Sequence, residues 1–199
     1  MKGVIYISLL LLLLTTSQTL AQEVERRGFI GLGIGPSFPI GNFANKSSAN
    51  VFSGHAIPGY TDTILNFGYR YGDRFGVTAA LSYSEYFMTD DQSNDWWQVA
   101  GITAGPMYSM PINSRTSIDL KAMIGWMVLT PIFDSYSSDG VDNGLAVDLR
   151  TLIRYNISTR WAVFAEVGIQ SSNVSFTDQA QTEYRALISG FGIAFLPDI

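Results

Sequence analysis

The stretch GLAVDLRTLIRYNISTRWAVFAEVGIQ, residues 144–170, alternates apolar and polar side chains almost without interruption. One row holds Leu145, Val147, Leu149, Thr151, Ile153 and Tyr155, and the opposite row holds Asp148, Arg150 and Arg154. A period of two residues is typical of a β-strand, whose successive side chains point to opposite faces. The segment STR, residues 158–160, interrupts the alternation and predicts a hairpin whose second strand begins near Trp161.

The same alternation recurs along the chain and predicts about eight strands. They cover residues 28–37, 60–71, 75–84, 96–110, 118–128, 144–155, 161–170 and 183–196. Short turns near Asp73, Arg115 and Arg160 alternate with longer polar connections, which are residues 38–59, 88–95, 131–143 and 174–182. In an up-and-down antiparallel sheet, alternate connections lie at opposite ends. The order therefore predicts one rim of tight turns and one rim of loops.

The composition of the two rows indicates which face is inside. The polar rows are rich in Gly, Ala, Ser and Thr, which suits a crowded interior, whereas the opposite rows are long and aliphatic or aromatic. A water-soluble sandwich or barrel would bury the bulky row. Here the bulky rows carry almost no Lys or Glu that would keep them soluble. An apolar exterior requires a bilayer, and a closed barrel satisfies its backbone hydrogen bonds there.

Charged residues interrupt the polar rows in equal numbers of each sign, which predicts a paired network in the lumen. The predicted members are Asp62, Arg70, Asp119, Lys121, Asp148, Arg150, Arg154 and Glu166. A barrel of about eight strands has room inside only for side chains. Unpaired charges are costly in such an interior, whereas complementary ones satisfy each other. We therefore expect a structural plug, with a proton or ion path as the alternative.

Aromatic residues gather toward the strand ends and predict two girdles at the membrane surfaces. The expected turn-end girdle contains Tyr69, Tyr71, Phe75, Tyr108, Tyr155 and Trp161. The expected loop-end girdle contains Tyr86, Phe87, Trp96, Trp97 and Trp126.

The first residues predict export. MKGVIYISLLLLLLTTSQTLAQ, residues 1–22, has a lysine at position 2, an apolar run and the small residue Ala21 before Gln22. This is the layout of a cleaved secretory signal peptide, and the run is shorter than the roughly 20 residues of a spanning helix. We expect residues 1–21 to be removed and residues 22–199 to form one domain. The net charge of -5 argues against a nucleic-acid partner, and the absence of Cys excludes disulfides.

At this point the sequence resembles the small eight-stranded outer-membrane β-barrels of Gram-negative bacteria, the OmpA/OmpX-like barrel-domain family of the porin-like superfamily. The resemblance rests on GFIGLGIGPSFPIG (28–41) as first strand, the turns DRFG (73–76) and STRW (158–161), and ISGFGIAF (188–195) as closing strand. It implies an all-β, eight-stranded antiparallel up-and-down transmembrane β-barrel in the cell outer membrane. It also implies contact with lipopolysaccharide and with the barrel-assembly machinery during insertion. The family's closing strand often ends on Phe, whereas Leu196-Pro197-Asp198-Ile199 follow here.

Two loop features could carry chemistry, and each has a simpler interpretation. His55, the only histidine, lies near Ser53, but the His-x-Ser pattern of the lipid A deacylase family is absent because Ile57 follows. Asp134, Asp139, Asp142 and Asn143 offer oxygen ligands for Ca²⁺ or Mg²⁺, yet the order of an EF-hand is not met and the same residues favour turns. Asp90, Asp91, Asp95 and Asp178 add to an acidic loop end.

The sequence therefore predicts a non-enzymatic, monomeric outer-membrane barrel with a filled lumen and no cofactor, metal or catalytic residue. Its long acidic loops would support envelope integrity or surface interaction. The alternatives are a small-solute channel, a lipid-modifying barrel enzyme that uses His55, and a soluble lipocalin-like binder with its glycine-rich face outside.

Overall fold

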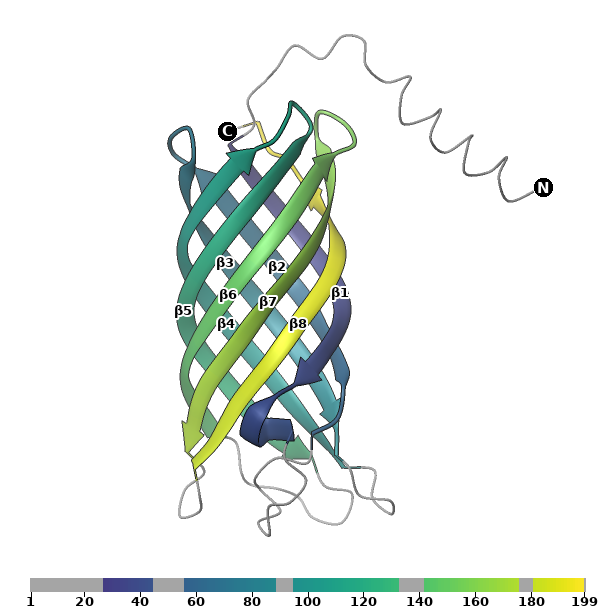
Figure 1. Cartoon of the computed structure of the whole chain (residues 1–199), viewed down its shortest axis with the longest axis vertical. Helices are drawn as coiled ribbons and strands as arrows, with labels where there is room; N and C mark the ends of the chain where they lie inside the picture. The colour runs from purple at the N-terminus through teal and green to yellow at the C-terminus, as the bar shows by residue number, and fades with distance from the viewer. Residues whose placement is uncertain (1–26, 45–55, 89–94, 133–141, 176–180, 199) are drawn as a thin grey trace, which may run out of the picture.

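The computed structural model describes residues 27–44, 56–88, 95–132, 142–175 and 181–198. Eight antiparallel strands close on themselves in sequence order, and this confirms the predicted fold class (Figure 1). The strands are β1 (Gly28–Pro39), β2 (Gly59–Arg70), β3 (Phe75–Phe87), β4 (Trp96–Pro111), β5 (Thr116–Ile132), β6 (Asp142–Asn156), β7 (Trp161–Ser175) and β8 (Gln181–Phe195). A 3-10 helix, η1 (Gly41–Ala44), follows β1. No helix among the described residues is long and apolar enough to cross a membrane.

The connections divide between the two ends of the barrel as the sequence predicts. Residues 71–74, 112–115 and 157–160 form tight turns at one end, where β1 begins and β8 ends; we call this end the turn rim (Figure 1). The other four connections leave from the opposite end, the loop rim. Local hydrogen bonds close the turns. The Asn113 side chain accepts a hydrogen bond from the backbone amide of Thr116 at 2.8 Å, and the Ser158 hydroxyl accepts one from the backbone amide of Trp161 at 3.0 Å.

The barrel is inside out relative to a water-soluble one. On β6, Asp148 is 0% and Arg150 is 3% exposed, whereas Leu149 between them is 51% exposed. The same alternation of buried and exposed residues runs along β4, β5 and β7, and the exposed rows are mainly aliphatic. Since the outward rows form a continuous apolar belt around the molecule, the surface suits a hydrocarbon surrounding.

Glycines on the lumen side make room for large side chains from other strands. The Phe164 ring comes within 2.5 to 3.1 Å of the point where a Cβ atom of Gly31, Gly33 or Gly192 would stand, and the Phe29 ring comes within 2.3 Å of that point at Gly68. Because the lumen of an eight-stranded barrel is narrow, each large inward side chain needs a bare backbone opposite it. This explains why the inward rows contain so many glycines and other small residues.

One irregularity, in β2, changes which face of the sheet the side chains of half the strand point to. Gly31 of β1 pairs with Asn66, but Gly33 pairs with Thr63, so β2 carries one residue more than its neighbour. The β3 side shows the same shift, between Thr63 and Leu65. This is a β-bulge at Ile64, and it reverses the facing of every β2 residue on its loop-rim side relative to a regular strand.

Candidate functional site in the barrel lumen

Arg150 lies at the centre of the lumen and holds two carboxylates. Its Nη2 atom lies 2.7 Å from Oδ2 of Asp148, and its Nε atom donates to both oxygens of that carboxylate at 2.9 and 3.0 Å. Its Nη1 atom lies 3.3 Å from Oε1 of Glu166 on the adjacent strand. One guanidinium therefore serves two buried acids, and the three groups together carry one negative charge.

Glu166 is held from the opposite wall by β2. The Thr63 hydroxyl donates to Oε1 of Glu166 at 2.8 Å, and the Asn66 amide donates to Oε2 at 3.0 Å. The Lys121 ammonium donates to the amide oxygen of Asn66 and lies 4.9 Å from the centre of the Phe29 ring. Asn66 therefore links the buried ammonium to the carboxylate, and the positive charge of Lys121 faces the surplus negative charge of the central group.

A polar chain continues from Asp148 toward the loop rim. The Gln170 amide donates to Oδ2 of Asp148 at 3.0 Å, and the Tyr184 hydroxyl donates to Oε1 of Gln170 at 3.2 Å. The hydroxyls of Tyr184 and Tyr86 lie 3.0 Å apart, and Tyr86 in turn contacts the Ser37 hydroxyl. These five residues come from five different strands, so the chain of hydrogen bonds ties the wall together across the lumen.

A second ion pair lies nearer the turn rim. Arg154 Nη2 lies 3.6 Å from Oδ2 of Asp119 and donates to the Ser117 hydroxyl at 3.1 Å. The Ser109 hydroxyl donates to the other oxygen of Asp119 at 2.5 Å. The Arg154 guanidinium also lies 4.5 Å from the centre of the Phe29 ring. Phe29 therefore contacts the two cations Lys121 and Arg154, an arrangement that cation–π attraction favours.

The two remaining predicted members lie outside this centre. Arg70 ends β2 at the turn rim, where its Nη1 atom donates to the backbone oxygen of Asp73 at 3.2 Å. Asp62 pairs with Ile34 and Tyr83, which belong to the outward rows. The prediction that Asp62 faces the lumen is wrong, because the bulge at Ile64 turns it to the outer surface. Without these two residues, the lumen carries three basic and three acidic members of the predicted set, which are Lys121, Arg150 and Arg154 against Asp119, Asp148 and Glu166.

The bulge also explains which lumen residues the sequence analysis missed. In an uninterrupted strand with Asp62 and Arg70 inward, Thr63 would face outward, yet it faces the lumen and contacts both Arg150 and Glu166. Asn66, Ser109 and Gln170 lie on the inward rows as expected, but uncharged polar residues give no signal of pairing in a sequence. Only an extra residue between two alternating runs, at Ile64-Leu65, could have indicated the reversal.

The expected loop-end girdle needs a second correction. Phe87 and Trp126 are outward and exposed, but Tyr86 and Trp97 are fully buried. Both point into the lumen because they share the facing of Ser84 on β3 and Val99 on β4. Phe43 of η1 enters the same cluster, with its ring centre 5.2 Å from that of Tyr86, 5.1 Å from Tyr184 and 6.0 Å from Trp97. These aromatics close the loop end of the lumen.

The loop features lie mostly outside the described residues. His55, Ser53, Asp90, Asp91, Asp134, Asp139 and Asp178 all fall there, so the structure says nothing of them. Asp142 is described, and its carboxylate accepts a hydrogen bond from the backbone amide of Asn143 at 2.7 Å. Such a local bond from an Asp side chain to the backbone is common near turns. Within the described segments, no group of three or more His, Asp or Glu side chains could hold a metal ion.

The comparisons with known proteins identify the fold. No protein-family description and no curated protein sequence matches the chain. Among solved structures, the chain is similar to Neisserial surface protein A, with a TM-score of 0.56 and 14% identity over 85% of this chain and 97% of that one. It also matches Ail, the attachment invasion locus protein of Yersinia pestis, with a TM-score of 0.48 and 13% identity over 85% of this chain and 99% of that one. The match to OprG of Pseudomonas aeruginosa has a TM-score of 0.47 and 12% identity over 86% of this chain and 97% of that one. The chain has the fold of the small eight-stranded outer-membrane barrels.

Proposed function

We propose that the protein is an integral, non-enzymatic outer-membrane protein whose barrel is closed by its own side chains. The observation that supports this is the continuous filling of the lumen from rim to rim. Three layers follow one another: an apolar cluster at the turn rim, the ionic centre around Arg150, and the aromatic cluster around Phe43 at the loop rim. A barrel filled in this way stabilises a membrane-embedded scaffold and leaves the loop rim as the part that meets partners.

The two outer layers are apolar. The turn-rim layer consists of Phe29, Met107, Leu152, Ala162, Phe164, Ala194 and Leu196. The loop-rim layer consists of Phe43, Ala56, Tyr86, Met88, Trp97, Val99, Met127, Leu129, Ala146, Tyr184 and Ala186. Each layer joins residues from opposite walls of the barrel. A hydrated ion would have to displace one layer to reach the charged centre and the other layer to leave it, which argues against a small-solute channel.

The centre itself argues against a proton path. A proton relay needs groups that can accept a proton on one side and release one on the other. The chain from Tyr184 to Lys121 runs instead through the amides of Gln170 and Asn66 and through the guanidinium of Arg150. Amides and guanidinium groups hold their protons at neutral pH, so these links interrupt a relay.

The position in the envelope is part of the same proposal. We place the chain in the outer membrane after cleavage of a signal peptide near Ala21, with the turn rim toward the periplasm and the loop rim outside. Outer-membrane lipid and lipopolysaccharide would surround the belt, and the barrel-assembly machinery would insert it. The long connections at the loop rim are acidic, and we assign to them envelope or surface interactions, with the chain acting as a monomer.

Conductance tests the closed lumen. Purified protein in planar lipid bilayers should give no unitary current steps. The triple variant Arg150→Ala, Phe164→Ala and Trp97→Ala removes part of each of the three layers and provides the reference for an opened barrel. Insertion of both proteins is verified by their recovery from the membrane. Steps of uniform size from the unmodified protein would contradict the proposal and favour a channel.

A further inference from the structure

Each of the four strands that leave the turn rim is directly preceded by an arginine. The strands are β1, β3, β5 and β7, and the residues before them are Arg27, Arg74, Arg115 and Arg160. The backbone carbonyl of each arginine accepts a hydrogen bond, at 2.7 or 2.8 Å, from an amide at or near the end of β2, β4, β6 or β8. The four residues, which we call the arginine ring, therefore hold equivalent places around the rim and lie two strands apart in the closed sheet.

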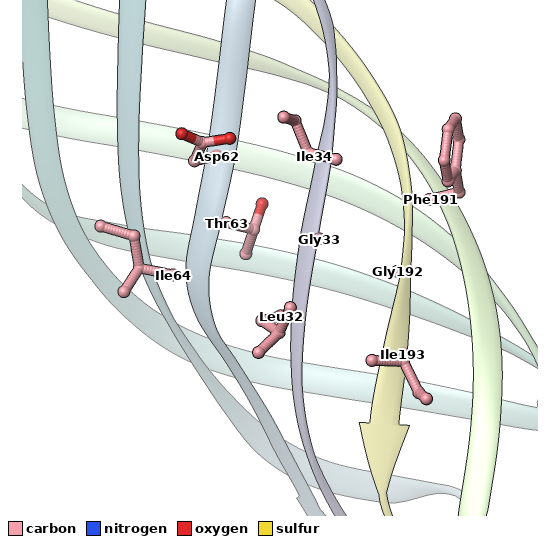
Figure 2. Close-up of a pocket in the computed structure, with 9 residues that line it drawn as sticks. All are labelled: Leu32, Gly33, Ile34, Asp62, Thr63, Ile64, Phe191, Gly192 and Ile193. Atoms are coloured by element: carbon pink, nitrogen blue, oxygen red, sulfur yellow. The ribbon is translucent and has the colours of Figure 1, made fainter.

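The apolar belt extends to this rim. Figure 2 shows three of its outward side chains, which are Leu32 on β1, Ile64 on β2 and Ile193 on β8. Phe195 ends β8 two residues later and is also exposed, with its ring centre 5.5 Å from that of Trp161. Since Trp161 directly follows an arginine of the ring, the belt ends where the ring begins.

Aromatic side chains mark the depth of the arginine ring in a membrane. Arg74 Nη1 donates to the Tyr108 hydroxyl at 3.0 Å, and the Tyr108 ring centre lies 5.2 Å from that of the exposed Phe75. Tyrosine and tryptophan at the end of an apolar surface are typical of the level of the lipid head groups. The long stem of an arginine lets its guanidinium remain at this level beside the aromatic rings. The arginine ring therefore faces head groups rather than acyl chains.

The turn rim carries a surplus of positive charge. Outside the strands at this end, the described residues comprise the four arginines and two acids, Asp73 and Asp198. Asp198 lies 3.7 Å from Arg160, but both side chains are more than half exposed, so water screens the pair. At the loop-rim ends of the strands, the described charged residues are mainly acidic, namely Glu85, Asp95, Asp142 and Glu183 against Arg185. An anionic head group is therefore attracted at the turn rim and disfavoured at the loop rim.

The spacing of the arginine ring favours lipid over a protein as its partner. A protein that docks on the rim would contact one sector of the barrel, whereas lipid surrounds the whole circumference. Arginines two strands apart place one guanidinium in each quarter of this circumference. A guanidinium pairs with phosphate through parallel hydrogen bonds, and basic residues at a membrane surface attract anionic lipid. The arrangement therefore fits a surrounding layer of phosphate head groups.

We propose that the arginine ring binds anionic phospholipids in the leaflet on the turn-rim side, with the lipid phosphates on the guanidinium groups. A zwitterionic head group carries the same phosphate together with a cation, which the ring repels, so the ring selects by net charge. This inference rests on the membrane placement of the proposed function, and it adds a lipid class and a leaflet to it. It does not depend on the closed lumen, because the ionic centre around Arg150 contains none of these four arginines.

Quenching of Trp161 fluorescence by brominated lipids tests the proposal. Trp161 follows Arg160 and is 45% exposed, whereas the other three tryptophans lie in the loop-rim halves of β4 and β5. The variant with Trp96→Phe, Trp97→Phe and Trp126→Phe is inserted into phosphatidylcholine vesicles. These contain an equal small fraction of brominated phosphatidylglycerol or brominated phosphatidylcholine, both with the same acyl chains. We expect the phosphatidylglycerol to associate about fivefold more strongly near Trp161, which corresponds to about 1 kcal/mol for one basic residue at an anionic surface.

Two exchanges of the arginine ring separate charge from packing. With Arg27→Gln, Arg74→Gln, Arg115→Gln and Arg160→Gln together, the two brominated lipids should quench Trp161 equally. With lysine at the same four positions, most of the preference should remain, because the charge is kept. Arg160→Gln alone removes the arginine next to the reporter and should remove most of the preference, which keeps the test valid if the fourfold exchange does not fold.

A reporter near the opposite rim provides the matched control. A variant that keeps Trp126, which is 51% exposed, as its single tryptophan should show no preference for phosphatidylglycerol. Arg185→Gln, at the loop-rim end of β8, should leave the result at Trp161 unchanged. Heat-dependent gel mobility establishes that each variant is a closed barrel before its quenching is measured.

Equal quenching of Trp161 by the two lipids would overturn the proposal and would indicate that the arginine ring meets a soluble partner instead. A preference that survives the glutamine exchanges, or one that Trp126 shares, would overturn it as well. Failure of the folded protein to enter vesicles is a different result, because it would contradict the membrane placement and the proposed function together with this inference.

Discussion

At the scale of single residues, large side chains in the lumen pack against glycines, which have no side chain. Phe164 and Phe29 occupy space that glycines on other strands leave free. Among the charged residues, Arg150 is the shared cation of two carboxylates, Asp148 and Glu166. Many lumen contacts therefore join different strands, and the effect of a substitution depends on what the partner loses.

Replacement of Arg150 by Met illustrates this dependence. The variant keeps a long side chain but leaves Asp148 and Glu166 buried without their cation. Breaking a buried ion pair in this way costs about 3–5 kcal/mol of unfolding free energy. Leu149→Met on the neighbouring outward position should change it by only about 0.5 kcal/mol. Urea unfolding in detergent, followed by tryptophan fluorescence, measures both values, and equal midpoints for the two variants would contradict the role given to Arg150.

Residue chemistry also shows how far the sequence could predict the site. Charge and alternation together bring Asp119, Lys121, Asp148, Arg150, Arg154 and Glu166 to the inward rows. The hydrogen-bond partners of these charges could not be predicted from the sequence. Thr63, Asn66 and Gln170 are common polar residues, and their partners lie on strands that are distant in the sequence. Equal numbers of charges suggested a complete balance, and Asp62 shows that counting signs does not establish facing.

At the scale of elements, β2 is the strand that departs from a regular pattern. Periodicity predicted one continuous alternation from residue 60 to residue 71, whereas the bulge at Ile64 divides it into two halves of opposite phase. A pattern with a period of two shows the inserted residue only as two adjacent apolar residues, here Ile64 and Leu65, and it does not say which of the two is the extra one. The misplaced Tyr86 and Trp97 have a different cause: aromatic residues near strand ends suit a membrane girdle and a lumen plug equally well.

Spin labels placed along β2 test the bulge directly. Single cysteines at positions 61, 62, 63 and 65 carry a nitroxide, and the chain contains no native cysteine that could interfere. We expect labels at 62 and 65 to collide with oxygen dissolved in the lipid, and labels at 61 and 63 to be shielded. An uninterrupted strand would group 61 and 63 with 65 and shield only 62. That grouping would contradict both the lumen contact of Thr63 and the outward position of Asp62.

At the scale of the whole molecule, closure of the sheet controls stability. All eight strands have two hydrogen-bonded neighbours, and no sheet edge is left open. The number of strands and the alternation of short and long connections were predictable because both follow directly from the sequence. The plugging of the loop end by Phe43 was not, since η1 lies within a connection that shows no periodicity.

A closed barrel should remain folded in sodium dodecyl sulfate until it is heated. We expect the protein to migrate differently on a gel before and after boiling, because the compact barrel and the unfolded chain differ in size and in bound detergent. The same assay on fractionated envelopes tests the proposed location, with the folded form expected in the outer-membrane fraction. Identical mobility with and without boiling, or recovery in buffer without detergent, would contradict a membrane barrel.

The pairing of β1 with β8 has a kinetic consequence. The other seven pairings join strands that are consecutive in the chain and can form as hairpins, but this one joins the first strand to the last. Until β8 pairs with β1, the sheet has two bare edges and an apolar outer face. A chain that lacks β8, or that has not yet been inserted, is therefore prone to edge-to-edge aggregation, and a holding chaperone would be needed until the barrel closes.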